Sequence, residues 1–448
     1  MSMEPESSEK FMIRLKTYVN SLRIRFVALL SADPLLKGIL ILGSGTAISQ
    51  ILGIIFIPII TRMYPPAVYG TLAVFSSLIS ILLVVSTLRY ELTIPIAEKD
   101  DDAEYLVILC FFILSIVTVI VFVFLAVWGD YLAGIFHFEF LAPYYWLFCI
   151  GLFGASTYQI LTFWALRSKQ YILMTRTNIS QNICGSVSKI ILGFLSFGSS
   201  GLIVGEVIGS WVGIGSLGEK ILPKIWRTIH ALDLHLMRAL AYRYRKFPTY
   251  SMPSAFVNVI ALQVPTLFLS GLFGFQIVGL FALSSSMLIR PVSFIAGSIS
   301  EVYTAECADL FRQKSDKLLP LFLDTTKKLF MFGAPVVLAA AIVAPVVFPI
   351  IFGSAWKDAG MFVLPLSIFV LSQFVVSSTD RLELYGYNDW SLAWNISRTL
   401  LVLSGFYLAY LFKFSPITTI WIFSLLMALM YVICYLLNVK AITLLMKN

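Results

Sequence analysis

The chain has 448 residues, of which 59% are hydrophobic and only 12% are charged, and its mean hydropathy is +0.90. Water-soluble domains have about 25% charged residues, so this composition excludes a soluble protein and indicates a multi-span membrane protein. The formal net charge of +8 does not imply a nucleic-acid partner, because in a membrane chain the positions of the cations matter more than their sum.

Residues 1–34 come before the first apolar span and carry charges throughout. Phe11, Leu15 and Leu22 recur at helical spacing among Lys and Arg residues, which predicts an amphipathic segment on the cytoplasmic membrane surface. A solvated basic tail is the alternative. No compact apolar stretch precedes a small-residue cleavage site, so we expect no signal peptide.

Twelve apolar stretches follow, each close to the roughly 20 residues that cross a hydrocarbon core of about 30 Å. They are predicted near 38–60, 68–88, 105–128, 141–165, 177–198, 200–218, 249–273, 275–299, 328–351, 360–380, 390–412 and 416–438. The expected fold is therefore an all-α polytopic membrane protein with about twelve transmembrane helices in two six-helix lobes. Its expected divisions are an N-lobe at 35–219, a basic connector at 220–247, a C-lobe at 248–440 and a cytoplasmic tail at 441–448.

The distribution of cations predicts the orientation. With the N-terminus inside, only Arg62, Lys357 and Lys413 of the 32 Lys and Arg residues lie outside. Three more, Lys189, Arg290 and Arg398, lie within spans. Because cytoplasmic loops are enriched in Lys and Arg, both termini are expected on the cytoplasmic side.

The connector at 220–247 divides the spans into two sets of six. Its apolar residues recur at helical spacing from Ile221 to Leu240 and alternate with cations. This pattern predicts an interfacial helix on the inner membrane surface that links the two lobes. A second hypothesis is that its cations gather anionic lipid.

Lys189 and Glu206 are ionisable residues inside the fifth and sixth predicted spans. Charged side chains are costly in a bilayer and usually face a protein interior or a watery cavity. Both residues are expected about 20 Å from the inner face, at 1.5 Å per helical residue. They form either a neutralising structural pair or a substrate-contacting cation beside Glu206 as an ion-coupling group.

Arg290 and Arg398 lie in the eighth and eleventh predicted spans, about 15 Å and 12 Å from the inner face at the same rise per residue. Neither has an acidic residue within a helical turn of sequence. Guanidinium groups stay charged when desolvated and bind oxygens in pairs. We therefore predict that Arg290 and Arg398, with Lys189, bind a phosphate or pyrophosphate. Snorkelling of the arginines to the inner interface is the alternative.

Prolines punctuate several spans, and those at Pro58, Pro265 and Pro291 are expected to let helices bend. The five cysteines are scattered singly and the three histidines are isolated, so no metal site or cofactor is predicted. No phosphate-binding loop and no catalytic constellation is found. Transport by this chain would use an ion gradient or a substrate gradient.

Several motifs resemble those of polysaccharide-transporter (Wzx-type) flippases of the MOP superfamily, which are relatives of MATE exporters. The motifs are Gly45-Thr-Ala-Ile-Ser-Gln-Ile-Leu-Gly53, Pro58-Ile-Ile-Thr-Arg-Met-Tyr-Pro65, Tyr69-Gly-Thr-Leu-Ala-Val-Phe75, Leu88-Arg-Tyr-Glu-Leu-Thr-Ile-Pro-Ile-Ala97, Ile299 to Ala308 and Phe352-Gly-Ser-Ala-Trp-Lys-Asp-Ala-Gly360. The resemblance implies a V-shaped, MATE-like bundle around a central cationic cavity. It implies that Arg89 and Glu91 form a gate or loop anchor.

The same resemblance implies a function and partners. The substrate would be a polyprenyl-pyrophosphate-linked oligosaccharide, moved between leaflets of a bacterial inner membrane. Membrane lipids and the polymerase and glycosyltransferases of the same pathway would be its partners. The alternatives are a membrane-embedded polysaccharide polymerase or ligase, a MATE-like exporter of small molecules, and a lipid II flippase.

Overall fold

The computed structural model describes residues 34–136, 144–219, 221–230, 233–313 and 315–446, and every secondary-structure element in these ranges is a helix. The amphipathic segment predicted at the N-terminus falls on residues 1–33, outside the described residues. A predicted all-helical fold is thus confirmed for the described ranges.

The first group of helices precedes the connector. It consists of α2 (Pro34–Met63), α3 (Pro66–Val85), the 3-10 helix η1 (Tyr90–Ile96), α4 (Asp100–Phe136), α5 (Tyr145–Arg167), α6 (Tyr171–Phe194), α7 (Gly198–Trp211) and α8 (Ile214–Gly218). The connector contains α9 (Leu222–His230), α10 (Leu234–Arg243) and the short π-helix η3 (Phe247–Ser251). The second group consists of α11 (Met252–Arg312), α12 (Leu318–Phe352), the 3-10 helix η4 (Ser354–Trp356), α13 (Lys357–Ser377), α14 (Asn388–Leu411) and α15 (Pro416–Leu445).

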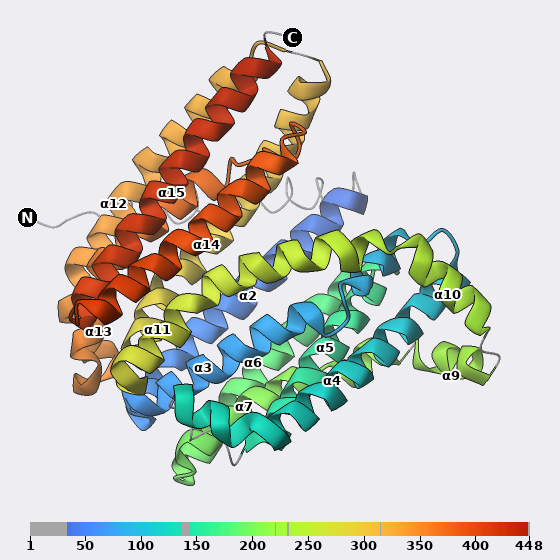
Figure 1. Cartoon of the computed structure of the whole chain (residues 1–448), viewed down its shortest axis with the longest axis horizontal. Helices are drawn as coiled ribbons and strands as arrows, with labels where there is room; N and C mark the ends of the chain where they lie inside the picture. Colours follow the sequence, from blue (N-terminus) through green and yellow to red (C-terminus); the bar gives the residue numbers. More distant parts are fainter. Residues whose placement is uncertain (1–33, 137–143, 220, 231–232, 314, 447–448) are drawn as a thin grey trace, which may run out of the picture.

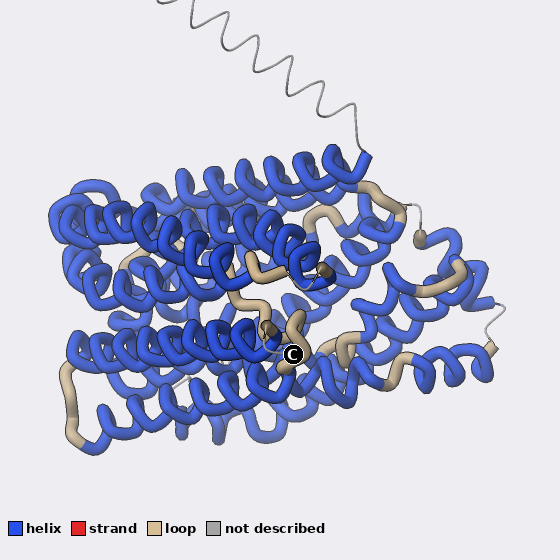
Figure 2. Tube along the Cα trace, turned by 90° about the horizontal axis from the view of Figure 1, so that it is seen from above, coloured by secondary structure: helices blue, strands red, loops and turns tan. Residues whose placement is uncertain are grey.

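The two groups diverge from a shared end, so that the molecule has the outline of a V (Figure 1). We call the shared end, where α2 ends at Met63 and α12 ends at Phe352, the closed end; it lies at the lower left of Figure 1. The two arms separate toward the open end, which carries α9 and α10 on one arm and the end of α15 on the other. Seen from above, the loops lie mainly at the ends of long, closely aligned helices (Figure 2).

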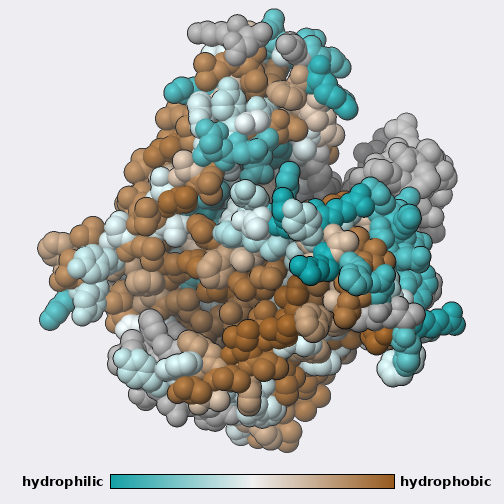
Figure 3. Space-filling model, turned by 45° about the vertical axis from the view of Figure 1, so that its right-hand side comes forward, coloured by the Kyte–Doolittle hydropathy of each residue, from teal (hydrophilic) through white to brown (hydrophobic). Residues whose placement is uncertain are grey.

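The chain is a multi-span membrane protein. Nine helical stretches within the described ranges are long and apolar enough to cross a bilayer. Hydrophobic residues cover the body of the molecule and hydrophilic residues gather toward the ends of the arms (Figure 3). Two predicted spans, near 177–198 and 390–412, correspond to α6 and α14, which are not among the nine. Both helices are long enough, but polar side chains interrupt their apolar sequence.

The helix α11 covers two predicted spans, and it breaks between them. Its one non-helical residue is Gly274, with φ 78° and ψ 174°, a backbone conformation open to glycine because it has no Cβ. The spans had been predicted to meet at this residue. The apolar stretch ends at Gly297, close to the predicted span end at 299. The helix itself continues to Arg312, and in this extension Tyr303 and Cys307 are buried against α12 residues.

Other predicted boundaries also fall short of the helices. α4 continues past the predicted span end at 128 as far as Phe136, and α12 begins at Leu318 rather than 328. Apolar length marks only the part of a helix that crosses lipid, whereas backbone hydrogen bonding continues as far as side-chain contacts support it. Helices therefore extend past the predicted spans.

The connector forms two helices instead of the predicted single one. α9 ends at His230 and α10 begins at Leu234. The Asp233 side chain caps α10 by accepting hydrogen bonds from the main-chain N–H groups of His235 and Leu236. On α9, Ile225 is buried and the Thr228 hydroxyl donates to Glu104 of α4 at 2.8 Å. The connector is therefore held against the first group.

Candidate functional site

Glycines bring α6 and α7 into close contact. A Cβ on Gly185 would lie 3.3 Å from the Cα of Gly209, and one on Gly205 would lie 2.9 Å from the main-chain nitrogen of Lys189. Small residues of this kind let membrane helices approach closely enough for their backbones to pack. The Lys189 side chain consequently lies across Gly205.

This packing places Lys189 beside Glu206, the residue after Gly205. Lys189 Nζ lies 2.5 Å from Glu206 Oε2. The Lys189 side chain is 15% exposed and the Glu206 side chain 43% exposed, so the carboxylate remains accessible while it neutralises the cation. The structure brings the two residues together, as their equal predicted depth indicated; whether the pair acts in transport stays a prediction.

A neutral polar network joins α2 to α6 close by. The Ser49 hydroxyl donates to Asn178 Oδ1 at 2.9 Å, and the Asn182 amide donates to Ser49 Oγ. Ser49 is buried. Sequence reasoning missed this network because none of its members is charged. The signal was available in the two amides of Asn178 and Asn182, which lie one turn apart in a membrane helix.

Arg290 of α11 reaches the same place from the second group. Its Nη1 lies 3.4 Å from the position that a Cβ on Gly53 of α2 would occupy, and Asn182 Oδ1 lies 3.5 Å from that position. Gly53 thus leaves the space in which the two side chains approach. Arg290 is exposed and also acts electrostatically on Glu206.

Arg290 differs from Lys189 in having no neutralising partner. No carboxylate of the described residues lies within 4.0 Å of its guanidinium. We call Ser49, Asn178, Asn182, Lys189, Glu206 and Arg290 the polar cluster. It combines one paired cation, one cation without an ion pair in the described part of the chain, and neutral polar side chains, on helices that belong to both groups. Such a set can bind the oxygens of a phosphate or diphosphate.

Arg398 lies elsewhere, buried within the second group. It is 3% exposed, and its Nη2 donates to Asn258 Oδ1 at 2.8 Å and to Asn395 Oδ1 at 3.1 Å. Its guanidinium lies 4.5 Å from the centre of the Trp394 ring, and its Nε has no hydrogen-bond partner among the described atoms. The structure therefore does not place Arg398 in the polar cluster, and its predicted substrate contact stays a prediction.

Arg89 directly precedes η1, and Glu91 lies in its first turn. Arg89 has a left-handed backbone, with φ 65°, and its Nη1 lies 3.6 Å from Glu91 Oε1. Glu91 has no exposed surface and also accepts from Gln159 of α5 at 3.2 Å and from Thr87. Burial raises the pKa of the Glu91 carboxyl. These contacts fit a loop anchor, which stays a prediction.

The predicted helix-bending prolines lie inside long helices, Pro58 in α2 and both Pro265 and Pro291 in α11. In α11 the residue with non-helical backbone angles is Gly274 and not either proline. A role for the prolines in bending during transport stays a prediction.

The closed end joins the two groups through main-chain acceptors. Arg62, at the end of α2, donates to Ile350 O at 2.9 Å and to Ile351 O at 3.2 Å in the last turn of α12. Trp356 donates from Nε1 to Thr61 O at 2.8 Å and is fully buried. A cation at a helix carboxyl end is also favoured by the helix dipole. In the sequence, Arg62 stands out only as one of three cations predicted on the outer side.

The same end contains a glycine crossing between α3 and α11. A Cβ on Gly70 would lie 1.9 Å from Phe275 O, and a Cβ on Gly279 would lie 1.9 Å from Pro66 O. Real Cβ atoms do not approach so closely, so the two backbones touch only because both residues are glycine. The closed end is therefore a close contact between backbones.

Among the described residues no group of three or more His, Cys, Asp and Glu side chains has the arrangement of a metal site.

The chain resembles known proteins in both sequence and structure. The sequence model of a family described as polysaccharide biosynthesis protein matches residues 59–360. The amylovoran biosynthesis protein AmsL of Erwinia amylovora is 21% identical to the chain over 242 residues, which are 53% of this chain. The chain spans about 60% of the length of that relative.

Two solved structures share the fold. A lipid II flippase MurJ in an inward closed conformation has a TM-score of 0.65 and 13% identity, covering 90% of this chain and 87% of its own. An inward-facing multidrug resistance MATE family transporter of the MOP superfamily has a TM-score of 0.62 and 15% identity, covering 89% of this chain and 96% of its own. At these identities the likeness establishes the fold alone.

Proposed function

Because the chain belongs to the polysaccharide biosynthesis protein family, we propose that it is a flippase for polyprenyl-pyrophosphate-linked oligosaccharides. These are the repeat units of O-antigen, capsule or exopolysaccharide, carried from the inner to the outer leaflet of a bacterial inner membrane. Two resemblances support the proposal: one relative is named for amylovoran biosynthesis, and a protein of the same fold is a lipid II flippase.

The proposal includes twelve crossings in two lobes of six. The long stretch from Phe247 to Gly297 divides at Gly274 into two crossings. The helices α6 and α14 each have 24 residues, enough to cross, and they carry Lys189 and Arg398. A polar crossing helix is expected where side chains face a protein interior instead of lipid. The lobes then span 35–219 and 248–440, with the connector at 220–247 and a tail at 441–448.

The orientation follows from the cations. Arg62, Lys357 and Lys413 lie at the ends of α2, α13 and α14 that belong to the closed end. The cation-rich connector lies at the open end. With positive charge inside, the open end is cytoplasmic and the closed end periplasmic. The structure then corresponds to a state that admits substrate from the cytoplasm.

The observation that carries the proposal is the guanidinium of Arg290, which faces α2 and α6 from α11 and forms no ion pair with any described residue. An uncompensated cation inside a membrane protein is costly, and a bound diphosphate offsets that cost through paired, charge-assisted hydrogen bonds. The amide of Asn182 lies beside it, with Oδ1 toward the space next to Gly53. We assign binding of the substrate diphosphate to Arg290.

Lys189 and Glu206 provide the coupling step. While Glu206 is ionised it holds Lys189 in a bond of 2.5 Å. Protonation of Glu206 removes this attraction and frees Lys189 for the substrate phosphates. A proton taken up from one side and released on the other would couple the ion gradient to substrate binding. Alternating access then opens the closed end by breaking the Arg62 and Trp356 contacts.

A MATE-like exporter of small molecules is the second candidate, since the fold is shared with such a transporter. Exporters of organic cations need acidic binding residues, and in the polar cluster the single carboxylate of Glu206 is already paired. A polymerase or ligase would need catalytic side chains, and the transporter fold disfavours it. The cluster therefore favours an anionic substrate.

The experiment deletes the gene in its own bacterium and returns the wild type or Arg290→Ala. Surface polysaccharide is expected to disappear on deletion, to return with the wild type and to stay absent with Arg290→Ala. Arg312→Ala, at an exposed cation paired with Asp309, is the matched control and should restore polymer. Membrane levels of each variant are measured by immunoblot. Normal polymer with Arg290→Ala would remove Arg290 from the mechanism, and normal polymer on deletion would refute the function.

A further inference from the structure

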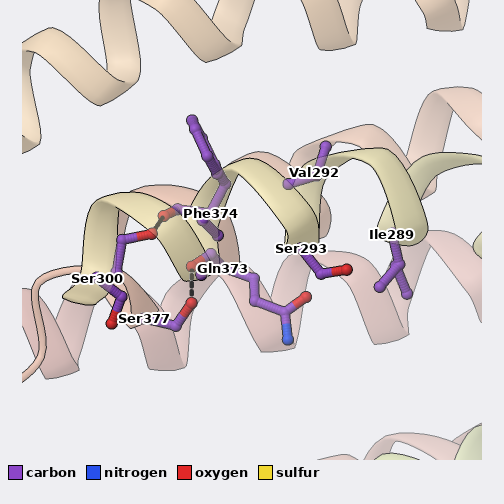
Figure 4. A pocket seen from close by; sticks show the side chains of 10 residues that line it. Ile289, Val292, Ser293, Ser300, Gln373, Phe374 and Ser377 are labelled. Carbon is purple, nitrogen blue, oxygen red and sulfur yellow. Dashed lines mark hydrogen bonds between the residues drawn. The ribbon is translucent and has the colours of Figure 1, made fainter. Parts of the chain in front are cut away.

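A pocket of about 250 Å³ lies between α11 and α13, within the second group. Its lining includes the side chains of Ile289, Ser293, Ser300, Gln373 and Ser377. Figure 4 shows Ser293 on α11 and Gln373 on α13 extending toward the same space. The pocket begins on the turn of α11 that carries Arg290. The polar cluster and this pocket are therefore neighbours on adjacent faces of one helix.

The hydroxyl groups of the pocket have a defined hydrogen-bonding character. Ser293 donates its proton to Arg290 O at 3.0 Å, and Ser377 donates to Gln373 O at 2.6 Å. Ser300 Oγ accepts from Arg381 at 2.6 Å. A hydroxyl that has donated its only proton can still accept through its lone pairs. Toward the pocket, Ser293 and Ser377 therefore act as acceptors, and both residues are exposed there.

Gln373 supplies hydrogen-bond donors, which the Ser293 and Ser377 hydroxyls lack. Its amide carries two donor protons and an acceptor oxygen, and it extends into the pocket while also reaching Tyr431. Phe374 lines the pocket, but its ring edge lies against Gly333 of α12. The pocket thus offers mainly acceptors, with the Gln373 amide and the Ser300 hydroxyl proton as its donors. An anion needs donors, so a ligand rich in neutral hydroxyl groups fits the pocket better than a phosphate does.

Two adjacent sites of opposite character match the two parts of a glycosyl diphosphate. The cations of the polar cluster suit the diphosphate, and the acceptor-rich pocket suits the hydroxyls of a sugar. We propose that this pocket binds the first sugar of the lipid-linked oligosaccharide, next to the diphosphate at Arg290. This inference rests on the proposed function and adds to it a sugar subsite formed by Ser293, Gln373 and Ser377.

The experiment measures binding to the full chain in nanodiscs. The probes are polyprenyl diphosphate and the same lipid carrying one glucose, galactose or N-acetylglucosamine. The pocket variants are Ser293→Ala and the double variant Gln373→Leu with Ser377→Ala. Arg290→Ala reports on the diphosphate, and Ser286→Ala is the matched control, because Ser286 lies on α11 outside the pocket and also donates to a backbone carbonyl. Thermal unfolding is recorded for every variant.

The wild type is expected to bind at least one sugar-bearing lipid more tightly than the sugar-free lipid. The double variant should weaken binding of that lipid about 10-fold, and Ser293→Ala about 3- to 5-fold, in line with the loss of one or two hydrogen bonds. Both should leave binding of the sugar-free lipid unchanged. Arg290→Ala should weaken binding of both lipids, and Ser286→Ala should weaken binding of neither.

Three results would overturn the inference. In the first, no sugar-bearing lipid binds more tightly than the sugar-free lipid to the wild type. In the second, the pocket variants bind the preferred lipid as the wild type does. In the third, the pocket variants lose affinity for the sugar-bearing and the sugar-free lipid equally, while Ser286→Ala keeps both affinities. The pocket residues would then have a structural role. These results leave the proposed function intact. Failure of the wild type to bind any of the four lipids would instead refute the proposed function and the subsite with it.

Discussion

The closed end and the polar cluster both join the first group of helices to the second, but with different interactions. At the closed end the contacts are close and use main-chain atoms, as in the crossing of Gly70 and Gly279 and the bonds from Arg62 to Ile350 and Ile351. In the polar cluster the contacts are between side chains. Arg290 approaches Asn182 without an ion pair among the described residues.

The difference has a physical consequence. Close backbone contact depends on shape, and it is either made or lost as a unit. A cluster of long side chains can exchange one partner for another with little movement of the backbone. The closed end is therefore suited to hold one conformation of the transporter, and the polar cluster to bind a ligand in that conformation. Three substitutions separate these roles, and a fourth tests a site outside both regions.

The largest effect is expected from Gly279→Ala. The added Cβ would lie 1.9 Å from Pro66 O, so α3 and α11 must separate, and overpacking of this kind costs about 1–3 kcal/mol. At a cost of about 3 kcal/mol, the ratio of closed to open molecules falls by about 100-fold. Distances between spin labels at Ala67 and Lys357 should lengthen. Gly271→Ala, which has no atom within 4 Å of its Cβ position, is the control; an unchanged distance distribution in Gly279→Ala would show that the crossing does not hold the closed end.

Glu206→Gln comes next and acts on the polar cluster. It leaves Lys189 unpaired, which costs about 3–5 kcal/mol for a fully buried pair. A loss of about 1–2 kcal/mol is expected here, because the Glu206 side chain is 43% exposed and therefore better solvated. The melting temperature should fall, while affinity for polyprenyl diphosphate should rise because Lys189 is freed.

The matched control for Glu206→Gln is Asp324→Asn. Asp324 also forms a bond of 2.5 Å to a lysine, Lys328, but both side chains are mostly exposed. Exposed pairs contribute about 0.2–1 kcal/mol, so Asp324→Asn should change neither stability nor affinity noticeably. A lower affinity for polyprenyl diphosphate in Glu206→Gln would contradict the assignment of Lys189 to the substrate.

Arg62→Ala should have a smaller effect, again at the closed end. It removes two hydrogen bonds to the last turn of α12, and because Arg62 is exposed the loss is about 1 kcal/mol. The same spin-label distances should show the open population rising about fivefold. Lys413→Ala removes a cation from the same end and should leave the distances unchanged. Equal behaviour of the two variants would mean that Arg62 acts only through its charge.

The smallest effect concerns Glu91, which belongs to neither region. Burial raises its pKa above the ordinary value of 4.5. The folded state therefore binds this proton more tightly than the unfolded chain does, and the resulting stability is present in acid and is lost as pH rises through the raised pKa. Glu91→Gln cannot ionise, so its melting temperature should fall less than that of the wild type between pH 4.5 and neutral. Parallel pH profiles would exclude a titrating Glu91.

Some features of the fold and of the polar cluster were predictable because the information lies within one helix or within two helices adjacent in the chain. Apolar length located the long helices, and the boundary at 273 and 275 matched the break at Gly274. Equal depth along two consecutive helices predicted the meeting of Lys189 and Glu206. Both predictions use rise per residue along helices that are adjacent in the chain, so they need no knowledge of how distant helices pack.

The remainder depends on contacts between distant helices. The bonds from Arg62 to α12 join residues 288 and 289 positions apart, and the approach of Arg290 to α2 requires the space beside Gly53. Arg398 shows the same limit, since its depth resembled that of Arg290 but its neighbours Asn258 and Asn395 hold it inside the second group. Rotation of a helix about its axis, which packing determines, decides which side chains meet.

Transbilayer movement of the lipid in reconstituted liposomes provides the decisive measurement. The substrate is a fluorescent polyprenyl diphosphate carrying an oligosaccharide, and its exposure on the outer surface is followed with a membrane-impermeant quencher. The wild type should speed this movement well above that in protein-free liposomes, Arg290→Ala should reduce it to the protein-free rate, and Arg312→Ala should match the wild type. Movement by Arg290→Ala at the wild-type rate, or none by the wild type, would contradict the proposed flippase.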